Sequence, residues 1–112
     1  MADIVLIVDD DAAVLTMLSK VIRSNGLAAE CAQSAEKALE ILSGREFDLI
    51  LMDVNMHGMD GFTAVETIRR KGIKTPIIIV SGRKEGKWMH YSISEEGLEK
   101  AQKYLDYLKG EV

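Results

Sequence analysis

Three short stretches of the chain are almost entirely apolar and show no alternation, and this feature limits the fold more than any other. They are Ile4 to Val8, Phe47 to Met52 and Ile77 to Val80. A strand with one face in water alternates apolar and polar residues, whereas a strand buried on both faces is apolar throughout. These stretches therefore predict parallel strands that are covered by helices on both sides of a sheet.

Stretches with helical spacing separate the strands, so the fold class is α/β, with repeated strand-helix units. One helix is expected from about Ala12 to Ser24, ending at Asn25-Gly26. Leu27 to Ala32 predicts a weaker strand. Ser34 caps a second helix that ends at Ser43-Gly44, and a third helix runs from Phe62 to near Gly72. The strand between these two helices is expected to extend from Phe47 to Val54.

The pattern changes after Ser81. Residues 83–87 predict a polar turn, Trp88 to Ile93 a strand, and Ser94 the cap of a last helix that runs to about Lys109. A turn of this length joins antiparallel neighbours, because a parallel crossover needs roughly a dozen residues or more. The fifth strand must therefore form a hairpin, leave the sheet, or pair with another molecule.

Acidic residues close two of the apolar stretches. Asp9, Asp10 and Asp11 follow the first stretch, and Asp53 follows Met52. The carboxyl ends of neighbouring parallel strands lie at the same edge of a sheet, so these acids are expected to share one pocket. Clustered carboxylates suit Mg²⁺, which prefers oxygen ligands, and a carboxylate beside the metal is able to accept a phosphoryl group. We expect Asp11 to cap the helix that follows rather than to bind metal.

Residues 1–82 resemble the receiver domain of bacterial two-component response regulators. The resemblance rests on Ile-Val-Asp-Asp-Asp at residues 7–11 and on Met-Asp-Val-Asn-Met-His-Gly-Met-Asp-Gly at residues 52–61. It implies a flavodoxin-like fold with four parallel strands, and a histidine kinase that donates the phosphoryl group. It also implies a phosphoacceptor at Asp53, Mg²⁺ ligands at Asp9, Asp10, Asp53 and the backbone carbonyl of Asn55, and a phosphate-binding hydroxyl at Ser81.

The chain departs from the receiver pattern in its last quarter. A full receiver has a fourth helix and then a fifth strand that ends in a Lys-Pro pair, whose lysine contacts the phosphate. Here the fourth helix is missing, and the only proline is Pro76. Lys84 or Lys87 is able to replace the missing cation; the alternative is that both are solvated turn residues. We therefore expect phosphorylation to be impaired or altered.

Residues 83–112 resemble a different family, the ArsR-type winged-helix repressors. A basic turn, an aromatic strand and the acidic helix start Ser94-Glu95-Glu96 recur there in the same order, as a wing and a closing helix. The recognition helix that would precede the wing is absent, so no element is available for reading bases in a major groove. The chain is thus interpreted as a possible chimera of a receiver-like core, residues 1–82, and a hairpin arm with a helix, residues 83–112. This second part either completes the same domain or forms a dimer interface.

The last predicted helix carries a narrow apolar seam. Its members recur at spacings of three, four and three: Leu98, Ala101, Leu105 and Leu108. In the ArsR-type family the closing helix contributes to the dimer, so the seam predicts a homodimer. The alternative is that it covers the sheet of its own domain.

Composition excludes several classes of protein. The 112 residues allow one domain of ordinary size, and 47% of them are hydrophobic, enough for a core. A formal net charge of -4 argues against general affinity for nucleic acid. The single cysteine, Cys31, is expected to be a small core residue and fits a reducing compartment. No apolar stretch is long enough to span a membrane, so a cytoplasmic location is expected.

The sequence thus predicts a signalling module that accepts a phosphoryl group on Asp53 in the presence of Mg²⁺. We do not expect an enzyme that processes a substrate. Two alternatives stay open: a dimeric fold chimera without a phosphorylation cycle, and a fragment that binds DNA through its wing.

Overall fold

Five strands and three helices follow one another in the computed structural model, which describes residues 3–53, 56, 58–80 and 88–91. The predicted alternation of strands and helices is confirmed through residue 80. In chain order the elements are β1 (Ile4–Val8), α1 (Ala12–Ser24), β2 (Ala28–Ala32), α2 (Ala35–Leu42), β3 (Leu49–Asp53), α3 (Gly61–Arg70), β4 (Ile77–Val80) and β5 (Trp88–Tyr91).

The strands form one sheet in the order β2-β1-β3-β4-β5. The first four strands are parallel to one another. β3 lies at the centre of the sheet, and every residue of it is buried. This flavodoxin-like arrangement of four parallel strands confirms the predicted fold class and explains why the apolar stretches show no alternation.

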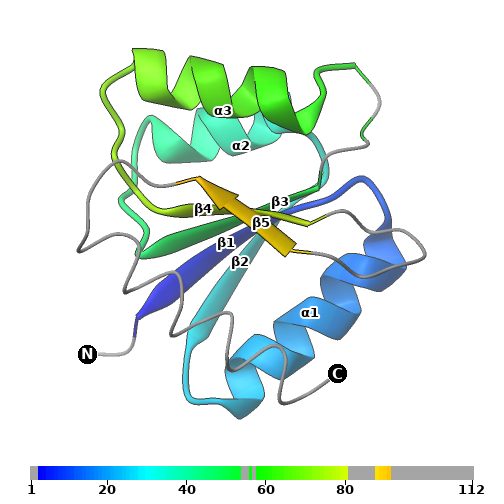
Figure 1. Cartoon of the computed structure of the whole chain (residues 1–112). Helices are drawn as coiled ribbons and strands as arrows, with labels where there is room; N and C mark the ends of the chain where they lie inside the picture. Colours follow the sequence, from blue (N-terminus) through cyan, green and yellow to red (C-terminus); the bar gives the residue numbers. More distant parts are fainter. Residues whose placement is uncertain (1–2, 54–55, 57, 81–87, 92–112) are drawn as a thin grey trace.

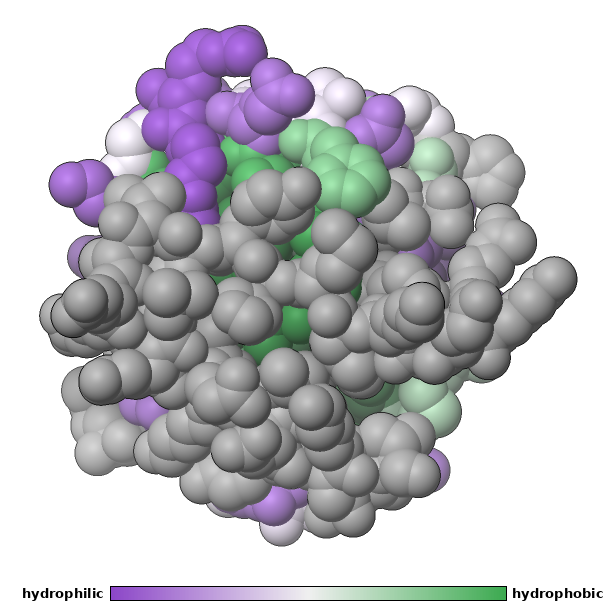
Figure 2. Space-filling model, viewed as in Figure 1, coloured by the Kyte–Doolittle hydropathy of each residue, from purple (hydrophilic) through white to green (hydrophobic). Residues whose placement is uncertain are grey.

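Helices cover both faces of the sheet (Figure 1). α2 and α3 lie on one face, where a core of buried side chains includes Leu6, Ile50 and Ile68. α1 lies on the other face and packs Leu15, Leu18 and Ile22 against the sheet. In Figure 2, hydrophilic side chains gather along the upper rim, over α3, and hydrophobic side chains lie beneath them toward the sheet.

Each helix begins at an oxygen-bearing side chain that accepts a hydrogen bond from the first turn. Asp11 accepts from the N–H of Ala13, as expected, and Ser34 accepts from the N–H of Lys37. Asp60, which the sequence analysis did not identify as a cap, accepts from the N–H of Thr63 at 2.8 Å. These side chains satisfy backbone donors that have no partner within the helix.

Two strands are shorter than predicted. β2 begins at Ala28 instead of Leu27, and β3 begins at Leu49 instead of Phe47 and ends at Asp53. Asp48, just before β3, bonds to the first residue of β1 twice: its N–H donates to the carbonyl of Ile4 at 2.9 Å, and its Oδ2 accepts from the N–H of Ile4 at 2.8 Å. Phe47 is nonetheless buried, so the apolar pattern identified a core residue that precedes the strand.

β5 pairs with β4 in the antiparallel direction, with Val80 opposite Trp88 and Ile77 opposite Tyr91. Of the three possibilities for the fifth strand, the structure therefore shows the hairpin. The predicted closing helix, its seam at Leu98, Ala101, Leu105 and Leu108, and most of the ArsR-like segment lie outside the described residues. The homodimer, the chimera and the two-part division of the chain stay predictions. Among the described residues, no helix is long and apolar enough to cross a membrane.

The central strand should dominate stability. Leu51 has no exposed surface, whereas Met17 on α1 is 51% exposed. We expect Leu51→Ala to lower the free energy of unfolding by about 3 kcal/mol, because it removes buried methyl groups and leaves a cavity. The control Met17→Ala should change it by less than about 0.5 kcal/mol. Urea unfolding measures both, and equal losses would contradict this placement of the core.

Candidate functional site: a carboxylate cluster at the ends of β1 and β3

The parallel register of β1 and β3 brings two of the predicted acids together. Val8 at the end of β1 pairs with Met52 of β3. Asp9 and Asp53 each come one residue later, so they emerge side by side at the carboxyl edge of the sheet. One oxygen each of Asp9, Asp10 and Asp53 forms a group in which all atoms lie within 4.8 Å of one another. The structure thus brings together the three carboxylates that the sequence singled out as ligands.

Two of the three carboxylates are buried. Asp9 is 6% exposed and Asp53 7% exposed, whereas Asp10 is half-buried. The backbone holds Asp9 in place: its N–H donates to the carbonyl of Ala32 at 3.1 Å, and its Oδ1 accepts from the N–H of Asp11 at 2.9 Å. Asp9 is therefore fixed between β2 and the start of α1, with little freedom to move away from the other acids.

The pKa of Asp9 is raised from 3.8 to about 6 in total, and burial is the largest cause. The hydrogen bond from the N–H of Asp11 acts in the opposite direction, because it stabilises the charged form. The negative charges of Asp53, Asp10 and Asp11 raise the pKa further. The cluster thus concentrates negative charge in a partly dry site and would gain stability from a cation.

The donor set fits a magnesium ion. Mg²⁺ takes oxygen ligands, commonly one or two carboxylates with several waters, and the cluster offers three carboxylates with one oxygen each within 4.8 Å of the others. Exposed acids often gather without a metal, but here two of the carboxylates are buried and one has a raised pKa. Asp9, Asp10 and Asp53 are therefore the residues that would hold the ion.

The other predicted site residues fall outside the described residues. These are Asn55, Ser81, Lys84 and Lys87. Val80, the residue before Ser81, pairs with Asp53. The register therefore brings the end of β4 to the acidic cluster, while the positions of these four side chains stay predictions.

The sequence analysis missed two residues that shape the loop after Asp53. Gly58 has a φ of +82°, a conformation that favours glycine, and a Cβ there would lie 3.4 Å from Oε2 of Glu36. Asp60 ends the loop as the cap of α3. Gly58 and Asp60 lie in a run of turn-forming residues, and this pattern could have indicated both the turn and the helix cap. Met52 is fully buried, and Met56 and Met59 are partly buried and pack against the core cluster that includes Leu6 and Ile68.

Comparisons with known proteins match this architecture. The family described as "Response regulator receiver domain" matches residues 5–104. Protein PetR of Rhodobacter capsulatus is 40% identical over 80 residues, and the aligned region covers 71% of this chain and 33% of that protein. Response regulator protein TodT of Pseudomonas putida is 37% identical over 81 residues, which cover 72% and 36% of the two chains. The chain thus spans about a third of the length of these relatives.

Solved structures show the same fold. The chemotaxis protein CheY4 of Vibrio cholerae superposes with a TM-score of 0.71 at 28% identity, covering 91% of this chain and 79% of that one. The response regulator protein TrrA of Thermotoga maritima, in complex with Mg²⁺ and BeF, gives a TM-score of 0.64 at 27% identity, with 67% and 65% covered.

The acidic cluster should destabilise the protein when no divalent cation is bound. The pKa of Asp9 is raised in the folded state. Its favourable contribution to folding stability is therefore fully present below pH 3.8 and is lost as the pH rises through about 6. Asp9→Asn removes the buried charge and keeps an oxygen for the N–H of Asp11. We expect it to raise the free energy of unfolding at about pH 8 by about 1–2 kcal/mol, with a smaller effect near pH 4.

Chemical denaturation in a chelator at the two pH values measures this. Asp3→Asn, at the opposite end of β1, serves as the control. A loss of stability on Asp9→Asn at the higher pH would contradict the assignment of Asp9 as a strained, charged group.

Proposed function

Because the chain belongs to the family of response regulator receiver domains, we propose that Asp53 accepts a phosphoryl group from a histidine kinase, with Mg²⁺ held by Asp9, Asp10 and Asp53. The observation that carries the proposal is the meeting of these three carboxylates at the carboxyl edge of β1 and β3. Receiver domains of response regulators accept phosphate from histidine kinases, and TrrA binds Mg²⁺ together with BeF. The chain is thus a phosphoacceptor in signalling rather than an enzyme that processes a substrate.

The chemical step is a transfer between two side chains. An oxygen of the Asp53 carboxylate attacks the phosphorus of a phosphohistidine, the new O–P bond forms, and the P–N bond breaks as the imidazole leaves. The short rigid strand β3 holds Asp53 in one position, and the buried edge of the sheet limits water around it. When bound, Mg²⁺ neutralises charge on the phosphoryl group during the transfer.

Asp9 and Asp10 have a second role in this arrangement. A phosphoryl group carries negative charge, and two carboxylates beside Asp53 repel it in the absence of a cation. Phosphorylation should therefore require the ion rather than merely proceed faster with it. Burial is the main cause of the raised pKa of Asp9, and the same repulsion between carboxylates adds to it.

The antiparallel direction of β5 gives Lys87 a place in the proposal. Asp53 pairs with Val80, and Val80 pairs with Trp88, so the beginning of β5 lies at the same edge as the acidic cluster. In the receiver family the lysine follows a parallel fifth strand, whereas here the strand is reversed. Lys87 directly precedes Trp88 in the chain, so we infer that it supplies the cation instead of a residue after the strand. Lys84 is three residues further away along the chain.

A titration should distinguish Mg²⁺ binding from binding of a phosphate mimic at Asp53. We expect backbone NMR signals of Asp9, Asp10 and Asp53 to shift with Mg²⁺, and a second set of shifts to follow when beryllofluoride is added as a phosphate mimic. Asp53→Asn should abolish the second set, because it removes the attacking oxygen's charge, and Asp10→Asn should weaken Mg²⁺ binding by about tenfold.

Asp3→Asn, at the other end of β1, should leave both responses unchanged. If saturating Mg²⁺ and beryllofluoride shift no signal near Asp53, the phosphoacceptor proposal is wrong. If Mg²⁺ produces shifts and beryllofluoride adds none, the chain keeps the metal site without the phosphorylation cycle.

Replacement of Lys84 and Lys87 tests which of them supplies the cation that contacts the phosphate. We expect Lys87→Ala to weaken beryllofluoride binding by about tenfold, the effect of losing one charge-assisted hydrogen bond, and to leave Mg²⁺ affinity within about twofold. Lys84→Ala should have a smaller effect, and Lys74→Ala, after α3, serves as a control for net charge. Equal effects of Lys87→Ala and Lys74→Ala would show that Lys87 does not contact the phosphate.

A further inference from the structure

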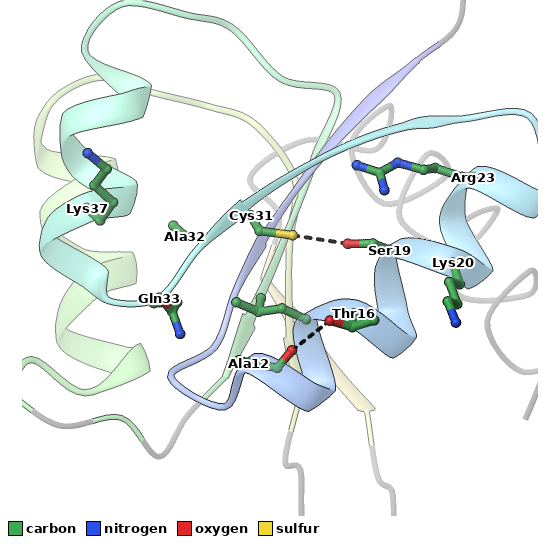
Figure 3. A pocket seen from close by; sticks show the side chains of 10 residues that line it. Ala12, Thr16, Ser19, Lys20, Arg23, Cys31, Ala32, Gln33 and Lys37 are labelled. Atoms are coloured by element: carbon green, nitrogen blue, oxygen red, sulfur yellow. Dashed lines mark hydrogen bonds between the residues drawn. The ribbon is translucent and has the colours of Figure 1, made fainter.

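A hollow of about 700 Å³ lies between α1 and β2 (Figure 3). It exists because small side chains face one another there. β2 contributes Cys31 and Ala32 to the lining, and α1 contributes Ala12 and Ser19. Ser19 and Cys31 point toward one another, with 3.0 Å between Oγ and Sγ, and do not fill the space. Cys31 is half-buried at this hollow rather than enclosed in the core as expected.

The rim of the hollow is positively charged. Lys20 and Arg23 of α1 and Lys37 of α2 line it, and none of its described lining residues is acidic. The chain as a whole has a net charge of -4, so this is a local reversal of sign. Figure 3 shows Lys37 on one side of the hollow and Lys20 and Arg23 on the other. Nζ of Lys37 lies 3.5 Å from Oε1 of Glu40, but both side chains are exposed, and ion pairs between exposed side chains are weak.

The outer edge of β2 borders the hollow. β2 stands at one end of the sheet, and its backbone pairs with β1 through residues such as Ala28 and Ala32. Because backbone groups alternate in direction along a strand, those of Ala29 and Cys31 point away from β1. Nη2 of Arg23 donates to the carbonyl of Ala29 at 3.2 Å. The edge thus offers main-chain groups at Cys31 beside three cations.

We propose that this edge binds an extended acidic peptide segment of a partner protein, which adds as a strand along β2 and lays its carboxylates over the hollow. Strand addition supplies main-chain hydrogen bonds, and side chains on alternate positions supply specificity. The cations stand on opposite sides of the hollow, so an extended chain reaches both sides, whereas a single small anion contacts one. Arg23 has five N–H donors and is able to keep the carbonyl of Ala29 while it binds a carboxylate.

A titration of the isotope-labelled full chain tests the proposal. The probe is a synthetic peptide of alternating Glu and Val, about seven residues long so that it spans a short strand, added in a chelator that keeps divalent ions away from Asp53. We expect backbone shifts in residues 16–23 and 28–33, and weaker binding at higher salt. A matched peptide with Gln in place of Glu should bind at least about fivefold more weakly.

Charge-removing variants locate the site. The double variant Lys20→Gln with Lys37→Gln should weaken binding of the acidic peptide by about fivefold, the effect of losing two exposed ion pairs. Lys71→Gln with Lys74→Gln removes the same charge beyond α3 and should change the affinity by less than about twofold.

Three results would overturn the proposal. One is equal weakening by both double variants, which would indicate attraction by net charge alone. Another is equal binding of the Glu and Gln peptides. The third is pyrophosphate that binds the same residues more tightly than the acidic peptide does, which would identify a site for small anions.

Discussion

The parallel pairing of β1 with β3 is the constraint on which the rest of the structure depends. Val8 opposite Met52 fixes where Asp9 and Asp53 emerge, and a shift of one residue would turn every side chain to the other face of the sheet. Burial on both faces prevents such a shift, because Leu49 to Met52 all lack exposed surface. The apolar core thus sets the geometry of the acidic cluster, although none of its side chains takes part in the chemistry.

The cluster opposes the stability that the core provides. Asp9 and Asp53 are almost completely buried, and their charges repel one another and Asp10. A chain selected for stability alone would place apolar residues there, as it does one position earlier in both strands. The arrangement makes sense where a bound cation balances the charge of the carboxylates, so the unfavourable electrostatics are themselves an argument for the proposed function.

The parts of the fold that could be predicted from sequence are those governed by local spacing. The apolar stretches identified β1, β3 and β4, and Asp11 and Ser34 were identified as caps because the side chain and the N–H that donates to it lie within a few residues. Asp48 could not be assigned in this way, since its partner, the N–H of Ile4, is distant in the chain. The acids were predicted to meet because parallel strands share an edge. The hollow could not be predicted, because it depends on residues of α1 and β2 that meet only in three dimensions.

The reversed fifth strand changes which part of the chain can serve the acidic edge. In a parallel strand, the residues that follow the strand arrive at the carboxyl edge; in β5, the residues that precede it do so, because Trp88 lies opposite Val80. A lysine in a short connection can therefore replace one that normally follows a strand, without any change in β1 or β3. In the proposed function, Asp9, Asp10 and Asp53 hold the ion, and the direction of β5 changes only which part of the chain supplies the lysine that contacts the phosphate.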